Sequence, residues 1–303
     1  MSHPSAPSDP VVAGLLAKTT FAPGEGPLEI ACSGGPDSTA LAVLACATGR
    51  SVVLHHVDHG LRSTSADEGR HVAALAAQLG CAVELHAVAV TSTGNVEEEA
   101  RLARRSVLPS TAATGHTMDD QAETVLVNLV RGAGASGLGA MRPGPRHPIL
   151  RLRRADTHGL CRHLGLSVVH DESNEDLSFV RNQVRRRVLP LLDEIGGRDL
   201  VPLLDRTAAV LRADEELLTA LAADAVPDPT DVAALRAAPR PLSVRALRVW
   251  LTEARRGAGR AHPPSAAEIA RVLTVVDGAV VATELAGGSR VARRAGRLSV
   301  ERA

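Results

Sequence analysis

LEIACSGGPDSTALAVLACAT, residues 28–48, is the stretch of sequence that decides the fold. LEIAC predicts a short buried strand, the two glycines allow a sharp turn, and an apolar helix follows from about Ser38. Backbone N–H groups at such a turn, together with the positive end of a helix dipole, bind anions. We therefore predict a phosphate-binding loop made of Ser33, Gly34, Gly35, Pro36, Asp37 and Ser38. The alternative is an ordinary glycine turn, and no Gly-Lys-Ser/Thr of a Walker loop follows it.

Strand and helix patterns alternate with short connections on both sides of this loop. Further strands are predicted at 51–57, 82–90 and 109–115, and helices at 63–80, 95–108 and 119–132. This order predicts an α/β fold, a parallel sheet with helices on both faces. Ligands of such sheets bind beyond the carboxyl ends of the strands, where both the SGGPDS loop and the GHTMDD segment (115–120) are expected.

The pattern changes after residue 142, where a Pro- and Arg-rich segment begins. Mostly helical sequence follows, and residues 279–303 alternate apolar and polar positions around Gly-Gly and Ala-Gly turns. That alternation predicts short antiparallel strands. We expect two domains, a catalytic domain at 1–205 and a small, mostly helical domain at 206–303.

Composition limits the classes of protein that remain. The chain has 303 residues, 45% hydrophobic content and a formal net charge of zero, so a uniformly basic nucleic-acid coat is excluded, although local patches are not. The four cysteines form no CxxC pair, which argues against a zinc ribbon, a redox dithiol or a cysteine-held cluster. No signal peptide or membrane span is predicted, so we expect a cytoplasmic protein without membrane contact.

His116, Asp120 and Glu123 are the strongest candidate side chains outside the loop. If a helix begins near Met118, the two acids share one face and offer a carboxylate pair for Mg²⁺ or for an ammonium group. The alternative is that acids are simply favoured by the helix N-terminus, which accounts for Asp119 and Asp120. It does not account for Glu123, which precedes an apolar run, or for His116 at a strand exit.

Asp58 and His59 close the second predicted strand, where they could contact a nucleotide or make structural hydrogen bonds. His55 and His56 lie close by, but successive residues of a strand point to opposite faces. A metal site built from these histidines is therefore disfavoured.

Arginines are concentrated in two segments. Charge runs of this kind usually form solvent-exposed surface. Arg101 and Arg104 share a helix face beside acidic residues. Arg181, Asn182 and Arg185 open a basic segment that follows an acidic stretch and precedes Pro190. We predict an active-site role for Arg181, Asn182 or Arg185, and contact with RNA phosphates for Arg186 and Arg187. Further arginines at 142–154 and 290–297 are candidates for contact with RNA phosphates.

The loop sequence resembles the PP-loop signature of the ATP pyrophosphatase superfamily. Four further segments resemble motifs of the tRNA(Ile)-lysidine synthase family: HVDHGLR (56–62), EEEARLARR (97–105), GHTMDDQAETVLVNLVRGAGASGLGAM (115–141) and DESNEDLSFVRNQVRRRVLPLL (171–192). Together they extend the likeness over residues 28–192, and GGSRVARRAGRLSVE near the C-terminus resembles that family more weakly. Arg105 stands where the family has a tyrosine.

This resemblance implies an enzyme that uses ATP and Mg²⁺ to join L-lysine to the wobble cytidine of a tRNA(Ile) with a CAU anticodon, through an adenylated cytidine. It implies ATP contacts by the six loop residues, Asp58 and His59, and Mg²⁺ at Asp37 and Asp120. A carboxylate that titrates near neutral pH, Asp120 or Glu123, would be the base. The catalytic residues implied are Asp37, Arg101, His116, Asp120, Glu123, Arg181 and Arg185.

Three rival functions stay open on the sequence: a PP-loop tRNA thiolase, a PP-loop ligase for a small molecule, and a non-enzymatic nucleotide- or RNA-binding module. The cysteine spacing argues against the thiolase, and the arginine patches argue against the small-molecule ligase. The acids at Asp37, Asp120 and Glu123 argue against a mere binder. The sequence does not determine the oligomeric state, and a homodimer is one alternative.

Overall fold

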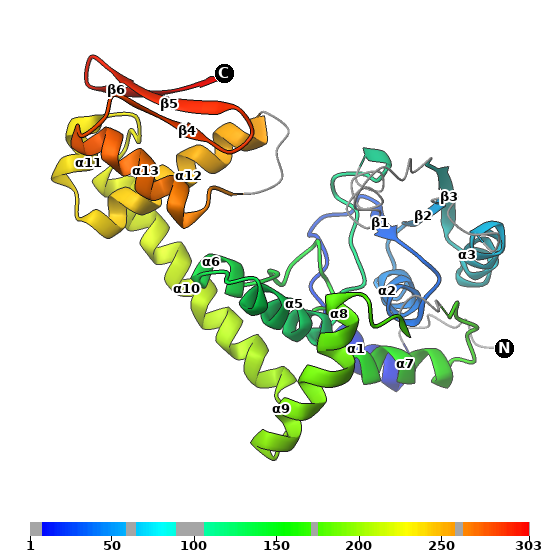
Figure 1. The fold of residues 1–303 in the computed structure, drawn as a ribbon. Helices are drawn as coiled ribbons and strands as arrows, with labels where there is room; N and C mark the ends of the chain where they lie inside the picture. The colour runs from blue at the N-terminus through cyan, green and yellow to red at the C-terminus, as the bar shows by residue number, and fades with distance from the viewer. Residues whose placement is uncertain (1–7, 59–64, 89–105, 171–174, 258–262, 303) are drawn as a thin grey trace. The chain divides into compact units, whose positions relative to one another are not determined.

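The computed structural model describes residues 8–58, 65–88, 106–170, 175–257 and 263–302 (Figure 1). The chain divides into two compact units, Met1–Ala209 and Val210–Ala303. Each unit has its own cluster of buried apolar residues.

The first unit is built on three parallel strands in the order β1-β2-β3. These are β1 (Leu28–Ala31), β2 (Val52–Asp58) and β3 (Ala82–Ala87). Ile30 lies beside Leu54, and Leu54 beside Val83, so the apolar positions align across the sheet. Ile30 and Leu54 are completely buried. The predicted α/β class is confirmed.

Helices cover the sheet face that carries these apolar residues. α2 (Pro36–Cys46) contacts β1 and β2, whereas α3 (Ser65–Leu79) contacts β2 and β3. α1 (Pro10–Leu16) and α7 (Arg154–His163) pack against α2. Residues 40–45 of α2 are completely buried as a result, and this burial fixes the phosphate-loop segment that precedes them.

The predicted fourth strand at 109–115 is reduced to a single parallel bridge between Ala113 and Ile30. Ala113 N donates to Glu29 O at 2.8 Å and Ala31 N donates to Ala113 O at 2.9 Å. The segment leaves the sheet at once, because Thr114 N donates instead to Arg146 O. The helix predicted at 95–108 lies mostly outside the described residues.

The acidic motif opens α5 (Met118–Val130), which begins where the sequence predicts. Thr117 and Asp120 form a capping box: Thr117 N donates to Asp120 Oδ2 at 2.8 Å, and Asp120 N donates to Thr117 Oγ1. A short helix, α6 (Ala135–Leu138), follows it.

The basic segment that contains Arg181 and Arg185 is helical and forms in three pieces. They are α8 (Val180–Gln183), one π-helical turn η2 (Val184–Val188) and α9 (Leu189–Gly196). Pro190 stands in the first turn of α9, where a residue without an N–H is tolerated. Both α8 and η2 pack against α5, which brings the basic segment to the acidic one. The long helix α10 (Val201–Ala225) then runs across the boundary between the units.

The second unit is mostly helical and ends in a small antiparallel sheet, as predicted. Its elements after α10 are α11 (Val232–Ala237), α12 (Arg240–Gly257), α13 (Ala266–Asp277), β4 (Ala282–Leu285), β5 (Ser289–Arg294) and β6 (Arg297–Arg302). Ala295 and Gly296 both have positive φ, as a two-residue hairpin turn requires. Val291 and Leu298 of the sheet are buried in a core shared with α13. No helix of the described residues is long and apolar enough to cross a bilayer.

Candidate active site

Glycine is required at two positions where the phosphate loop is closely packed. Gly34 has a φ of 82°, and a Cβ added there would lie 2.8 Å from the Val169 side chain. A Cβ on Gly115 would lie 3.0 Å from the backbone of Asp37 and Ser38. The first residue of the GHTMDD segment therefore packs directly on the SGGPDS loop, and the two motifs meet through their backbones.

The N-terminus of α2 is left open to a ligand. Its N-cap residue, Gly35, has no side chain to accept from the first-turn N–H groups. Ser38 Oγ donates to Gly35 O at 3.0 Å and lies 3.2 Å from Ser33 Oγ, so both hydroxyls line the turn. Free N–H groups and hydroxyls at a helix N-terminus suit an anion such as phosphate.

Two buried histidine nitrogens belong to residues that pack near this loop. Within the described residues, His56 Nε2 and His71 Nε2 are buried and have no hydrogen-bond partner. His71 packs beside Gly34, because a Cβ added to that glycine would lie 3.2 Å from its Cδ2 atom. An unpartnered buried nitrogen carries a free-energy penalty, and a polar ligand would remove it.

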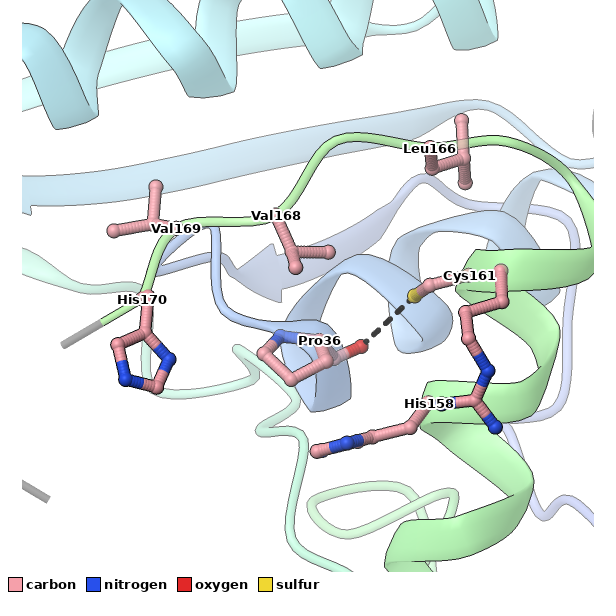
Figure 2. A pocket seen from close by; sticks show the side chains of 8 residues that line it. Pro36, His158, Cys161, Leu166, Val168, Val169 and His170 are labelled. Atoms are coloured by element: carbon pink, nitrogen blue, oxygen red, sulfur yellow. Dashed lines mark hydrogen bonds between the residues drawn. The ribbon is translucent and has the colours of Figure 1, made fainter.

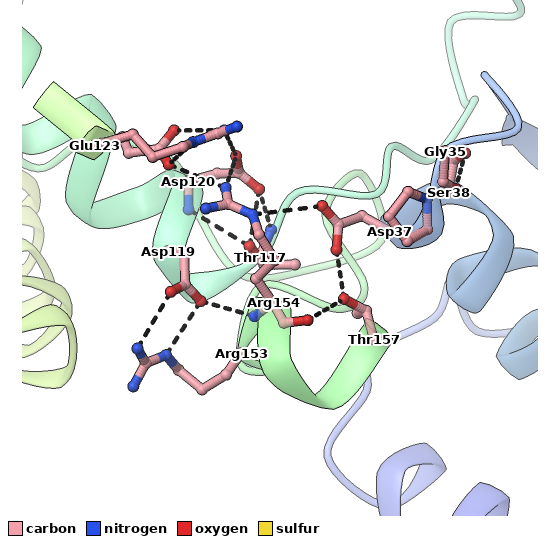
Figure 3. A network of polar contacts seen from close by, with 12 residues as sticks. Gly35, Asp37, Ser38, Thr117, Asp119, Asp120, Glu123, Arg153, Arg154 and Thr157 are labelled. Atoms are coloured by element: carbon pink, nitrogen blue, oxygen red, sulfur yellow. Dashed lines mark hydrogen bonds and ion pairs between the residues drawn. The ribbon is translucent and has the colours of Figure 1, made fainter. Parts of the chain in front are cut away.

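Glu123 is the most deeply buried acid of the site, with a side chain that is 0% exposed, and arginines surround it (Figure 3). Arg154 Nη2 donates to Oε1 at 3.0 Å, Arg181 Nε donates to Oε2 at 2.8 Å and Arg185 Nε donates to Oε1 at 2.7 Å. Arg185 reaches both oxygens, because its Nη2 also lies 3.1 Å from Oε2. A fully buried carboxylate of this kind is tolerated only because it is paired.

Asp120 divides its two oxygens between two roles. Oδ2 caps α5 through Thr117, as a helix-terminal acid would. Oδ1 points into the site, where Arg154 Nη2 and Arg181 Nη2 each donate to it at 3.0 Å (Figure 3). The expected helix-capping contact accounts for one oxygen, and the other oxygen is held by two arginines.

Arg154 connects these acids to Asp37 of the phosphate loop. Its Nε lies 3.8 Å from Asp37 Oδ2, while its Nη2 binds Asp120 and Glu123. The Thr157 hydroxyl donates to Asp37 Oδ1 from the next turn of α7. The carboxylates of Asp37 and Asp120 thus face the same guanidinium, on opposite sides of it (Figure 3).

The two aspartates differ in acidity although they share this neighbour. Burial raises the pKa of Asp37 from 3.8 to about 6, and the Thr157 hydrogen bond and the Arg154 charge only partly oppose the rise. Burial also acts to raise the pKa of Asp120, but Arg154 and Arg181 outweigh it and lower that pKa to about 2. Asp120 is therefore fully ionised at neutral pH, whereas Asp37 titrates just below it.

Asp119 is turned away from this pair. It accepts two bonds from the Arg153 guanidinium, at 3.1 and 3.2 Å, and one from the backbone N–H of Arg154 at 2.8 Å. It therefore fixes the start of α7 against α5, and its role in the described structure is to position Arg154.

Comparison with known proteins places this arrangement in a family. Residues 12–192 match the PP-loop domain, and residues 231–299 match the TilS substrate binding domain. A tRNA(Ile)-lysidine synthase from Nocardia farcinica is 39% identical over 96% of both chains. Another from Mycolicibacterium paratuberculosis is 43% identical over 73% of both chains. The chain belongs to the tRNA(Ile)-lysidine synthase family. It is accordingly an enzyme with a PP-loop domain, as predicted.

A solved structure supports the fold beyond this family. The U34-tRNA thiolase NcsA from Methanococcus maripaludis, described with its 4Fe–4S cluster, superposes with a TM-score of 0.55. The match covers 66% of this chain and 78% of that one at 17% identity. A likeness at that identity concerns the fold alone.

Other residues implied by the likeness to the tRNA(Ile)-lysidine synthase family lie nearby or outside the described chain. His116 Nδ1 lies 2.7 Å from Thr114 Oγ1, and its ring packs edge-on against His147. Its charge is one of the influences that lower the pKa of Asp120, which indicates that it borders the site. Asp58 is the last residue of β2. His59 and Arg101 lie outside the described residues.

The sequence interpretation missed Arg154 and Thr157. Arg154 was included only in an arginine-rich segment thought to contact RNA, and nothing in its neighbours indicated that it would turn inward. In the structure Arg154 is the first residue of α7, and no local feature of the sequence gave the direction of its side chain. Only the packing of α7 against α2 shows which way it points.

A pocket of about 190 Å³ lies behind the phosphate loop (Figure 2). Pro36, His158 and Cys161 line one side of it, and Leu166, Val168, Val169 and His170 line the other. Cys161 Sγ donates to Pro36 O at 3.4 Å, so two of the lining residues are bonded to each other. This pocket shares Pro36 with the phosphate loop.

Proposed function

We propose that this enzyme joins L-lysine to C2 of the wobble cytidine of a tRNA(Ile) with a CAU anticodon, using ATP. The names of its relatives support tRNA as the substrate and lysine as the group added. The observation that carries the proposal is the position of Arg154, which contacts Asp37 of the phosphate loop and the Asp120–Glu123 pair at once. One residue thereby joins a site for phosphate to a site for a cation.

The two parts of the chain would divide the work. We assign ATP chemistry to residues 1–205 and tRNA binding to residues 206–303, in the cytoplasm where tRNA is found. The PP-loop match at 12–192 and the substrate-binding match at 231–299 support this division. Arg290, Arg294 and Arg297 of the terminal sheet are exposed, as phosphate contacts would need to be.

The reaction would take two steps. The C2 oxygen of cytidine attacks the α-phosphorus of ATP, and the bond to the β-phosphate breaks, so that pyrophosphate leaves over the loop. The lysine ε-amine then attacks C2 and loses a proton, and AMP departs with the former C2 oxygen. In both steps the protein acts by positioning groups and by neutralising charge.

Asp37 is the residue best suited to hold Mg²⁺. Carboxylate oxygens are preferred ligands of this ion, and Asp37 Oδ2 has only a distant contact with Arg154, at 3.8 Å. Asp120 Oδ1 is occupied by two guanidinium groups, so it could join the ion only after they move. When bound, Mg²⁺ would neutralise charge on the departing pyrophosphate.

The base for the second step would depend on the same arginines. We predicted Asp120 or Glu123, titrating near neutral pH, as the base, but a pKa of about 2 makes Asp120 a poor proton acceptor as it is now paired. Phosphate groups of ATP are stronger partners for Arg154 and Arg181 than a shared carboxylate is. Their transfer to ATP would release Asp120 and Glu123 to bind the lysine ammonium, and would raise the pKa of Asp120.

Release of pyrophosphate tests the proposal and separates it from its rivals. We expect stoichiometric release only when ATP, lysine and tRNA(Ile) with a CAU anticodon are present, with lysine incorporated into the tRNA. Release with a small acceptor and no tRNA would indicate a small-molecule ligase. Release that requires a sulfur donor would indicate a thiolase, and nucleotide binding without release under any condition would indicate a sensor.

A matched pair of variants assigns the result to this site. Glu194 is an exposed acid of α9, so Glu194→Gln should leave pyrophosphate release unchanged. Asp37→Asn should reduce release by at least about 100-fold, which is the size of effect usual for one electrostatic group in a preorganised site. Equal release by the two variants would contradict the role of Asp37.

A further inference from the structure

A second cluster of polar side chains lies on the sheet face opposite α3. Side chains alternate along β2 and β3, and the register sets His55 beside Glu84 and Val57 beside His86. His56 and Leu85 point towards α3, because a Cβ added to Gly69 of that helix would meet both. His55, Glu84 and His86 therefore share the other face of the sheet.

The donor atoms of these three residues form a small triangle. His55 Nδ1 lies 3.0 Å from His86 Nε2 and 3.4 Å from Glu84 Oε2, and His86 Nε2 lies 3.8 Å from the same oxygen. A tetrahedral ion with metal–ligand bonds of about 2.0–2.1 Å places its ligands roughly 3.3 Å apart. The three separations lie on both sides of that value, so one ion could reach all three atoms after shifts of a few tenths of an ångström.

Glu29 of β1 holds His55 in the orientation that such an ion requires. Glu29 Oε2 lies 2.5 Å from His55 Nε2, and His55 itself is only 3% exposed. When Nε2 donates its proton to this carboxylate, Nδ1 keeps its lone pair and directs it towards His86 and Glu84. A carboxylate behind a ligating histidine is the usual second layer of a protein zinc site.

We propose that His55, Glu84 and His86 bind a divalent ion of the zinc class. Two imidazoles and one carboxylate favour Zn²⁺, Co²⁺ or Ni²⁺ over Mg²⁺, which prefers oxygen ligands, so this site is separate from the one at Asp37. A fourth position is left for water. The ion would tie β2 to β3 three residues before Asp58 and so stabilise the strand end that borders the phosphate loop.

The metal-free alternative is a hydrogen bond between the two histidines. In that state His86 Nε2–H donates to His55 Nδ1. This hydrogen bond accounts for the 3.0 Å separation of the two nitrogens without an ion. Binding of an ion would move this proton to His86 Nδ1 and place the metal between the two nitrogens. The alternatives differ in whether Glu84, whose side chain is 60% exposed, contributes to the site.

Titration of the untagged, chelator-treated full-length chain with Zn²⁺ tests the proposal. We expect one equivalent to bind and to raise the melting temperature by about 5–10 °C at 100 times the dissociation constant. Co²⁺ should show the intense visible bands of a four-coordinate ion, and X-ray absorption should give metal–nitrogen distances of about 2.0–2.1 Å. Mg²⁺ at the same concentration should give neither effect.

Variants identify the ligands. His86→Gln should weaken Zn²⁺ binding by more than about 100-fold, and Glu29→Gln by about 10–100-fold, since second-layer partners have effects of that size. His163→Gln removes a histidine of α7 outside the cluster and should bind as the unaltered chain does. Because Glu84 is exposed, Glu84→Gln should fold normally. If His86→Gln does not fold, the Zn²⁺ affinity of Glu84→Gln tests the proposal instead.

The proposal is overturned by a chain that binds no stoichiometric Zn²⁺, or by a six-coordinate Co²⁺ spectrum. Undiminished affinity in His86→Gln or Glu84→Gln would overturn it equally, because the histidine pair alone would then explain the geometry.

Discussion

Asp37 and Asp120 stand in the first turns of two helices on either side of Arg154, yet one has a pKa of about 6 and the other of about 2. The difference arises from how each helix N-terminus is used. α5 closes its own N-terminus with a capping box, and Asp120 receives two guanidinium groups as well. α2 has no side-chain cap, and Asp37 has one hydroxyl and one distant arginine.

In one region of the site, the polar groups therefore have their partners before any ligand binds. In the other region they do not. The Asp120–Glu123 region is a closed set of ion pairs, in which each buried carboxylate already has arginine partners. In the Asp37 region, the pKa of the acid is raised and the helix N-terminus has no side-chain cap. Both features lower the stability of the folded chain, and a bound ligand would remove this cost. Such a division is expected where function requires a strained group beside a rigid support.

Glu123→Ala should give the largest effect, because it breaks the closed region. Arg154, Arg181 and Arg185 would lose a buried partner, and loss of one member of a buried ion pair costs about 3–5 kcal/mol. Urea unfolding at neutral pH measures this change. Glu194→Ala, an exposed control, should change stability by less than about 0.5 kcal/mol. A loss of similar size in both would show that the arginines are not held by Glu123.

Asp37→Asn should have the opposite sign and stabilise the protein above pH 6. The folded-state pKa of Asp37 lies above its unfolded value of 3.8, so ionisation lowers the stability of the unaltered chain as pH rises from about 4 to 6. Asparagine removes that loss, which amounts to about 3 kcal/mol. The difference in unfolding free energy between the two proteins should grow over that window and then stay constant. A variant less stable at pH 8 would contradict the raised pKa.

Arg154→Met tests whether this arginine creates the contrast. We expect the pKa of Asp120 to rise towards that of Asp37, with a loss of about 2 kcal/mol at neutral pH, since Arg181 and Arg185 still hold the acids. The folded-state pKa of Asp120 is lowered, so its contribution exists above pH 4 and disappears as pH falls towards 2. Unfolding curves between pH 2 and 7 should therefore converge at the acid end. Parallel curves would mean that Arg154 does not lower that pKa.

Thr157→Val should have the smallest effect on stability and should widen the difference between the pKa values of Asp37 and Asp120. The Thr157 hydroxyl donates to Asp37 and lowers its pKa, so its removal should raise that pKa above 6, with a loss of about 1 kcal/mol at pH 8. The pH window in which Asp37→Asn stabilises the protein should then extend upwards in the Thr157→Val background. An unchanged window would show that burial alone sets the acidity of Asp37.

The sequence predicted the parts of this site that depend on local pattern. The strand, the double glycine and the apolar helix at 28–48 indicated the loop, and the spacing of Asp120 and Glu123 indicated their common helix face. These features depend on residues close in the chain. The meeting of Gly115 with the loop backbone, by contrast, was not predictable, because no local rule states how closely two strand exits approach.

Features that depend on long-range packing could not be predicted from the sequence. Arg154 was grouped with surface arginines, and the bridge at Ala113 was predicted as a full strand because its pattern resembled one. The raised pKa of Asp37 and the lowered pKa of Asp120 arise from burial and from three arginines distant in sequence. The metal interpretation was confined to histidines along one strand, so Glu84 and His86 on its neighbour were overlooked.

Incorporation of labelled L-lysine into a tRNA(Ile) transcript with a CAU anticodon tests the central claim most directly. The unaltered chain, Asp37→Asn, Asp120→Asn and the control Glu194→Gln would be compared, with tRNA binding measured in parallel. If the two aspartates serve one ATP-driven reaction, both variants should lose incorporation while tRNA binding and the control stay unchanged. Incorporation at the unaltered rate in either aspartate variant would contradict this account of the site.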